Sequence, residues 1–320
     1  MKNPFVRIRS AGWFAVNTME KVDDLVRRMD ALQQAVGRIE QIHSEHNNSS
    51  TLADHEFKVY SQWGEDGIIQ HLLRRIPVPN SVFVEFGVEN YREANTRFLL
   101  QNNYWSGLVI DGASTNIQAI KSDPLYWKYN LKVECAFIDR ENINTIMHTN
   151  GVQGDIGLLS IDIDGNDYWI WEAITCIQPR IVVCEYNSLF GYRHAVTVPY
   201  ERRFVRTQAH YSNLYFGASI AALDYLAKSK GYSLVGSTRA GNNAFFVRDD
   251  IIDTLRVLSP ENAWVRAAFR EARNADGILT FLDPSDGQRL LADLPLYDVE
   301  HDALIRVADL SSEKIRRFDS

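Results

Sequence analysis

Acidic residues close three successive apolar runs of the sequence. Glu85 ends VFVE before the loop residues Gly87 and Glu89, Asp111 ends LVID, and Asp139 ends AFID. An acid after a second strand can accept hydrogen bonds from both hydroxyls of a ribose, and an acid after a third strand can accept one from an adenine amino group. The three runs together predict a nucleotide-type site.

The charge of the first loop indicates which nucleotide it suits. A dinucleotide site needs the pattern GxGxxG so that backbone amides can approach a pyrophosphate. This loop has one of those glycines, and Glu89 stands where the second would be. Carboxylates at Glu85 and Glu89 would repel a pyrophosphate, and the lysine motif of a P-loop is absent. S-adenosylmethionine carries a sulfonium and an ammonium group and no phosphate, so the loop favours it.

A second group of oxygen-bearing side chains follows the next two apolar runs. Asp162 and Asp164 end LLSIDID, and Glu185 and Asn187 end IVVCEYN with the same spacing. Residues two apart on a strand point to the same face, so the four side chains meet if the strands are neighbours. Hard oxygen ligands favour Mg²⁺, Mn²⁺ or Ca²⁺. The alternative is that these groups hold the cofactor ammonium and polar substrate groups without a metal.

A metal-free reaction at a hydroxyl group would need a general base to remove the proton. Asp164, His194 and His210 are the candidates, although a single histidine in a loop is usually a surface residue.

Strands and helices alternate along the part of the chain that positions these residues, from about residue 55 to 250. Two further β-rich runs flank residues 239–243 and predict an antiparallel hairpin. Strand–helix alternation predicts an α/β fold, a mostly parallel sheet with helices on both faces. The five preceding strands are expected at residues 81–87, 107–112, 131–139, 156–165 and 179–187.

The loop of residues 188–217 is long and rich in tyrosine, arginine and histidine. Loops of this length in compact domains are usually functional or disordered, and the aromatic content argues against disorder. Tyrosine and arginine suit stacking on a sugar ring and pairing with an anionic group. We interpret it as the acceptor-binding loop; a subunit interface is the alternative.

Residues 19–43 are predicted to form a helix with an apolar heptad repeat. This pattern indicates either a coiled coil that makes a homo-oligomer or an amphipathic helix on its own domain. A polar linker follows, so we divide the chain into an arm and helix (1–54), a central domain (55–250) and a mostly helical extension (251–320). The heptad positions are Val22, Leu25, Met29, Leu32, Val36 and Ile39.

Composition excludes several classes of protein. The 320 residues carry a net charge of −7, which opposes binding to a nucleic-acid backbone. The three cysteines lack metal-binding spacing and predict reduced thiols in a cytoplasmic protein. No apolar run approaches the ~20 residues of a transmembrane helix.

The motifs VFVEFG, LVIDG, AFID and LLSIDIDG, with the closing hairpin, resemble those of class I S-adenosylmethionine-dependent methyltransferases. YSQWGEDGII before the first strand looks like the opening of FkbM-like and related bacterial sugar-modifying methyltransferases. The resemblance spans roughly residues 57–248 and implies a Rossmann-like sheet of seven strands ending in an antiparallel pair. Glu89 departs from the family pattern, which has a glycine there.

The resemblance also implies roles for individual residues. Glu85 and Gly87 would border the methionine moiety and the ribose, and Asp162 would lie near the methionine ammonium. Gln62 and Glu65 would close over the cofactor, or simply begin a polar helix. Asp111 would hold the ribose, and Asp139 would meet adenine.

Two likenesses concern the metal. An acid after strand four and an acid/amide pair after strand five resemble the metal sites of metal-dependent O-methyltransferases. DGNDY is similar, with one extra residue, to the DGDxY pattern of sugar-modifying antibiotic methyltransferases.

The leading hypothesis is methyl transfer from S-adenosylmethionine to an oxygen of a carbohydrate-like acceptor, of a cell-surface polysaccharide or natural product, with assistance from Mg²⁺ or Mn²⁺ left open. One rival is a nucleotide-binding assembly protein that keeps the fold without catalysis. A weaker rival is a nicotinamide-dependent oxidoreductase, which the missing glycines oppose.

Overall fold

The computed structural model describes residues 4–47, 49 and 51–311, so parts of the predicted N-terminal arm (1–3) and C-terminal extension (312–320) lie outside the described residues. Its central element is a seven-stranded sheet of order β3-β2-β1-β4-β5-β8-β7. β1 to β5 are parallel, and β8 is antiparallel to both β5 and β7. The predicted mostly parallel sheet with an antiparallel terminal hairpin is therefore confirmed. The strands are β1 (Val82–Phe86), β2 (Ser106–Asp111), β3 (Leu131–Cys135), β4 (Gly154–Ile161), β5 (Ile177–Glu185), β7 (Tyr232–Ser237) and β8 (Asn243–Arg248).

Helices cover both faces of the sheet because successive side chains of each buried strand point to opposite sides. Phe83 packs in an apolar cluster with residues of α2, α3 and α4, whereas Val84 packs in a second cluster with residues of α6, α7 and α9. Both side chains are fully buried. The helices are α2 (Glu65–Arg75), α3 (Arg97–Asn102), α4 (Ser114–Ser122), α5 (Pro124–Lys128), α6 (Ile143–Thr149), α7 (Asp167–Ala173) and α9 (Ile220–Ser229).

The order of the strands reverses at β1, which lies between β2 and β4. Crossover connections leave on opposite sides of such a point, so a crevice opens at the carboxyl ends of the neighbouring strands. The loops after β1, β2, β4 and β5 meet there.

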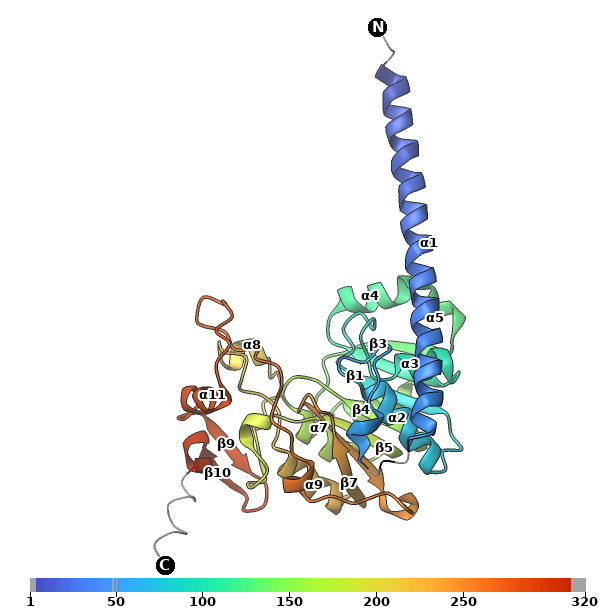
Figure 1. Cartoon of the computed structure of the whole chain (residues 1–320). Helices are drawn as coiled ribbons and strands as arrows, with labels where there is room; N and C mark the ends of the chain where they lie inside the picture. Colours follow the sequence, from blue (N-terminus) through green and yellow to red (C-terminus); the bar gives the residue numbers. More distant parts are fainter. Residues whose placement is uncertain (1–3, 48, 50, 312–320) are drawn as a thin grey trace, which may run out of the picture.

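The N-terminal helix α1 (Pro4–Glu45) is 42 residues long. Figure 1 shows it, in blue, running past the domain and projecting well beyond it, with only its C-terminal part beside α2 and α3. The predicted linker that follows includes a short 3-10 helix, η1 (Leu52–His55). Among the described residues, no helix is both long and apolar enough to cross a membrane.

The C-terminal extension differs from the helical expectation. It has the short helices α10 (Pro260–Ala263) and α11 (Pro284–Leu290), and the 3-10 helices η3 (Asp249–Ile251) and η4 (Val307–Ser311) near its ends. It also contains a hairpin, β9 (Pro295–Asp298) and β10 (Ala303–Arg306).

The hairpin pairs with β6 (Val196–Thr197), a strand within the loop of residues 188–217. Burial alternates along both strands of the hairpin. In β9, Leu296 is buried next to the exposed Pro295, and in β10, Leu304 is exposed next to the partly buried Ala303. That period-two burial is typical of a half-buried strand. The loop also holds η2 (Ser188–Phe190) and α8 (Arg206–Ala209), and its position is thereby fixed by residues about 100 positions later in the chain.

Candidate functional site

A cavity of about 600 Å³ lies at the carboxyl ends of β1, β2, β4 and β5. Among the described residues that line it, Arg206 is basic and eight are acidic. A low-dielectric cavity walled by one sign of charge attracts ligands of the opposite sign. The acids are Glu85, Glu89, Glu93, Asp111, Asp162, Asp164, Glu185 and Glu271.

Gly87 brings the loop after β1 against the end of β4. Its φ is 67°, and a Cβ placed on it would lie 1.7 Å from the backbone oxygen of Asp162. Only glycine fits such an approach. Glu89, where the resemblance described above predicts a glycine, also has a positive φ of 47°, and its backbone N–H donates to Asp111 Oδ2 at 2.8 Å. Glu89 therefore has a backbone conformation that a glycine favours.

Glu85 is buried in the wall of the cavity and is tied to the start of α3. It accepts hydrogen bonds from the Asn95 N–H (2.7 Å), the Thr96 N–H (3.1 Å) and the Thr96 hydroxyl. Burial raises the pKa of Glu85 to about 7, and these donors oppose the rise only in part. The carboxyl group therefore changes its charge near neutral pH.

Asp111 lies at the end of β2 and lines the cavity, as expected. Its carboxylate accepts from Glu89 as above and from the Ala113 N–H (2.8 Å) and Asn116 Nδ2 (3.0 Å). A carboxylate has about four acceptor positions, so these donors fix its orientation and leave room for a ligand hydroxyl.

Asp139 is not among the residues that line the cavity. One of its oxygens accepts from the N–H groups of Glu141 and Asn142, and the other from Arg202 Nε at 2.8 Å. Its neighbours Phe137 and Ile138 line the cavity instead. Phe137 is 48% exposed and offers an aromatic face there.

Gln62 lines the cavity, whereas Glu65 lies behind it. Glu65 is fully buried at the start of α2 and accepts from the backbone N–H groups of Trp63 and Gly64. Its other oxygen accepts from Asn243 Nδ2 at 2.8 Å. Since Asn243 lines the cavity, Glu65 positions a lining residue.

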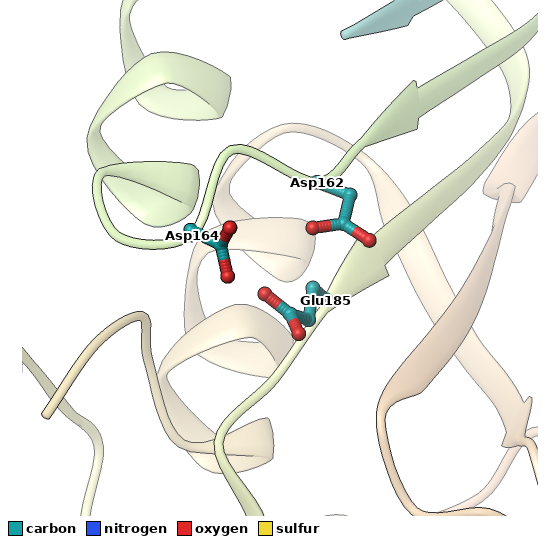
Figure 2. Close-up of side chains that lie close together, drawn as sticks. All are labelled: Asp162, Asp164 and Glu185. Carbon is teal, nitrogen blue, oxygen red and sulfur yellow. The ribbon is translucent and has the colours of Figure 1, made fainter. Parts of the chain in front are cut away.

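Figure 2 shows the carboxylates of Asp162, Asp164 and Glu185 facing one another across the ends of β4 and β5. One oxygen of each lies within 4.8 Å of one oxygen of the others. Burial, then the charges of the other acids, raises the pKa of Asp162 and of Glu185 well above the usual range. Glu185 Oε2 is buried and has no hydrogen-bond partner among the described residues. Three carboxyl groups held this close are stabilised by a cation or a proton.

The buried Asp167 holds the loop that carries two of these acids. It accepts from the N–H groups of Ile163 and Gly165, each at 2.9 Å. Asp164 has a φ of 56°, a left-handed conformation that aspartate tolerates better than most residues.

The structure does not bring Asn187, His194 or His210 to the carboxylates. The Asn187 carboxamide donates to the backbone oxygens of Leu214 and Phe216 and accepts from the Leu189 N–H. His194 lines a separate cavity of about 260 Å³. His210 contacts the Ser212 hydroxyl at 2.7 Å and does not line the carboxylate cavity. Asn187 organises the loop. Of the three candidate bases, Asp164, His194 and His210, Asp164 is the one that lines the carboxylate cavity.

Arg206 is the residue that sequence reasoning missed. Its Nη1 lies 2.6 Å from Asp164 Oδ1, its Nε donates to the Asn213 backbone oxygen, and its guanidinium lies 3.9 Å from the centre of the Phe216 ring. Burial alone would lower the pKa of Arg206, but the charges of Glu185 and Asp164 outweigh it and raise the pKa. The arginine content of the loop was the available signal, but the sequence did not indicate which arginine reaches the strand ends.

No protein-family model and no curated protein sequence matches the chain. Three similar solved structures are the N-terminal domain of EvdMO1 with SAH bound, an S-adenosylmethionine-dependent methyltransferase from Clostridium acetobutylicum, and PKMT2 from Rickettsia typhi in complex with AdoHcy. Their sequence identities are 11%, 8% and 10%, with TM-scores of 0.39, 0.38 and 0.38. The matches cover 66%, 57% and 62% of this chain and 94%, 90% and 55% of the respective structures.

Proposed function

We propose that the protein is an S-adenosylmethionine-dependent methyltransferase. The observation that carries the proposal is a cavity at the strand-order reversal whose lining has eight acids and one arginine. This charge suits a sulfonium and an ammonium group and opposes a pyrophosphate. S-adenosylmethionine would supply the methyl group. The residues of this chain would bind the cofactor, orient the acceptor and remove the proton of the acceptor hydroxyl.

Each part of the cavity suits one part of this ligand. The Asp111 carboxylate accepts three hydrogen bonds within the chain, which leaves about one of its four acceptor positions for a ribose hydroxyl. Phe137 and Ile138 provide an apolar wall for adenine. Gly87 allows close approach of the backbone. Burial raises the pKa of Glu85 and Asp162, and the ammonium end of the ligand would favour the ionised form of both carboxyl groups.

Asp164 and the loop of residues 188–217 are assigned to the acceptor. Asp164 lines the cavity, where Arg206 orients it; in a reaction without a metal, its carboxylate would accept the proton of an acceptor hydroxyl. Phe204, Arg206 and Asn213 of the loop also line the cavity. Aromatic, guanidinium and amide groups suit a sugar ring. We therefore propose O-methylation of a carbohydrate or related small acceptor of a polysaccharide or natural product.

A divalent cation fits Asp162, Asp164 and Glu185, because the three carboxylates converge and Glu185 Oε2 is buried without a hydrogen-bond partner among the described residues. We propose that these three residues would hold Mg²⁺ or Mn²⁺, with Asn187 outside the ligand set. Such an ion lowers the pKa of a bound hydroxyl group.

The three free cysteines suit a reducing compartment, and we propose that the reaction takes place in the cytoplasm.

Removal of divalent metal is expected to lower methyl transfer by on the order of 100-fold, because several kcal/mol of charge stabilisation would be lost. Activity is measured after treatment with a chelator and after Mg²⁺ or Mn²⁺ is restored. Mn²⁺ binding is followed separately by electron paramagnetic resonance in the wild type and in Glu185→Gln. Full activity in chelator, with no bound Mn²⁺, would remove the metal from the proposal and leave the rest.

Asp111→Ala is expected to weaken S-adenosylmethionine binding by about 1–3 kcal/mol, because ligand hydroxyls lose their acceptor and the Glu89 N–H loses its partner. Calorimetric titration measures the change. Asp139→Ala is the matched control, since Asp139 is an acid in the loop after β3 that does not line the cavity. An equal loss in both variants would show that the acids act through the fold rather than through contact with the ligand.

The decisive experiment is titration of the full chain with S-adenosylmethionine, S-adenosylhomocysteine and NADH, followed by a methyl-release assay with sugar acceptors. We expect binding of the first two ligands and not of the dinucleotide. Binding without turnover over a broad acceptor panel would favour the non-catalytic assembly protein. Binding of NADH alone would overturn the proposal.

A further inference from the structure

The helix α1 is anchored to the domain by its polar face. The Tyr60 hydroxyl donates to Asp30 Oδ1 at 2.6 Å, and Gln34 Nε2 donates to Gln101 Oε1 at 2.7 Å. One turn further on, Gly37 is buried, and a Cβ there would lie 2.5 Å from Val59 Cγ2. Glycine in the middle of a helix is unfavourable, and this close approach explains its presence.

The apolar face of the same helix is directed away from the domain. Nine large apolar side chains between residues 19 and 42 are 52–70% exposed. An amphipathic helix that covers its own domain would have its apolar face buried. For the described residues, this interpretation of the heptad repeat is therefore wrong. The exposed side chains, here called the heptad stripe, are Met19, Val22, Leu25, Val26, Met29, Leu32, Val36, Ile39 and Ile42.

We propose that the heptad stripe binds the same stripe of a second copy of this chain and forms a parallel two-stranded coiled coil. The repeat places valine or methionine at the first core position of each heptad and leucine or isoleucine at the second. β-branched residues at the first position with leucine at the second favour two parallel strands.

The apolar area of the heptad stripe and the charges that flank it are both compatible with a second copy of the helix. Fully burying an aliphatic side chain removes about 60–120 Å² from water, so the nine side chains provide roughly 500–1,000 Å² per helix, against about 800 Å² per partner in a standard interface. In the parallel register, the flanking pairs between chains are Lys21 with Val26, Arg28 with Gln33, and Ala35 with Glu40. No pair brings together two like charges, so nothing in the flanks opposes the pairing.

The geometry of the dimer follows from the two faces. Both domains lie at the same end of a parallel coiled coil, because each is held by the C-terminal part of its α1. The stripe and the polar anchoring face are separate, so dimerisation leaves the contacts of Asp30 and Gln34 intact.

The first test is the mass of the full chain by sedimentation equilibrium at micromolar concentration. We expect about twice the chain mass of 36.6 kDa. A monomer that binds no vesicles, or an assembly larger than a dimer, would overturn the proposal. A monomer that sediments with anionic phosphatidylserine vesicles only when the stripe is intact would overturn it in favour of a membrane surface.

Two variants at adjacent residues test the stripe itself. Leu32→Glu puts two carboxylates opposite each other in the dimer core and is expected to weaken dimerisation by roughly 100-fold. Ala31→Glu introduces the same group at an exposed position outside the stripe. We expect it to change the dimer dissociation constant by less than about threefold. Circular dichroism confirms that both variants are folded.

A mixing experiment tests the parallel register. Leu32→Glu and Leu32→Lys chains are each expected to be monomeric, and an equimolar mixture is expected to form the dimer again. Residue 32 faces residue 32 of the other chain only when the helices are parallel and in register. A mixture that stays monomeric while the wild type dimerises would exclude this pairing. Neither experiment depends on the methyl donor, so failure here leaves the proposed function untouched.

Discussion

Replacing Gly87 with alanine is expected to abolish cofactor binding and to lower the free energy of unfolding by about 2–4 kcal/mol. The alanine Cβ would lie 1.7 Å from the Asp162 backbone oxygen, and φ at this position is 67°. Either the loop after β1 or the end of β4 must therefore move, and both form the cavity. Denaturant unfolding and titration with S-adenosylmethionine measure the two effects.

Gly112→Ala is the matched control for this substitution. Gly112 lines the same cavity, but a Cβ there would have no neighbour closer than 3.6 Å. Its free energy of unfolding is expected to stay within about 0.5 kcal/mol of the wild type. Wild-type stability in Gly87→Ala would show that the contact between the two strand ends is not needed.

Asp164→Asn is expected to reduce methyl transfer by roughly 100-fold or more, while the affinity for S-adenosylmethionine changes by less than about threefold. Asparagine keeps the size of the side chain and tolerates the positive φ of this position, so the change removes the charge and leaves the backbone. The variant loses a proton acceptor and one of the three converging carboxylates. Single-turnover rates and calorimetric titration separate the chemical step from binding.

The same substitution also removes a partner of Arg206, and a control is needed for that effect. Glu271→Gln removes a second carboxylate that pairs with this arginine, 3.7 Å from its Nη2, with Asp164 intact. We expect it to keep activity within about threefold. Equal losses in the two variants would assign the effect to Arg206 rather than to Asp164.

The sheet could be predicted because its buried parallel strands are continuous apolar runs, and because an acid marks the end of several of them. Glu85, Asp111 and Asp162 follow from chain position alone, since the carboxyl ends of parallel strands meet at one edge. The sequence also predicts Asp139 at a strand end, but β3 ends at Cys135, and the Asp139 carboxylate binds local N–H groups and Arg202. An acid after an apolar run therefore predicts a side chain at the cavity only where the run stays in the strand up to that acid.

Residues of the long loop could not be placed from the sequence. Asn187 has the right spacing from Glu185 to share a face, yet the chain leaves the strand there and its carboxamide binds loop carbonyls. Arg206 reaches the carboxylates from a loop whose strand β6 pairs with a hairpin about 100 residues away. Such pairing depends on long-range packing, which no local pattern records.

The position of Arg206 makes it an internal counter-ion for the acidic strand ends. Any positively charged ligand that occupies the space among Asp162, Asp164 and Glu185 would compete with this guanidinium for the Asp164 carboxylate. The competition is reciprocal. A cation that displaces Arg206 weakens the attachment of the loop, and a ligand that fixes the loop lowers the affinity for the cation. A displaced guanidinium would then be free to pair with an anionic group, so the charge of one ligand at this site influences which second ligand the loop can accept.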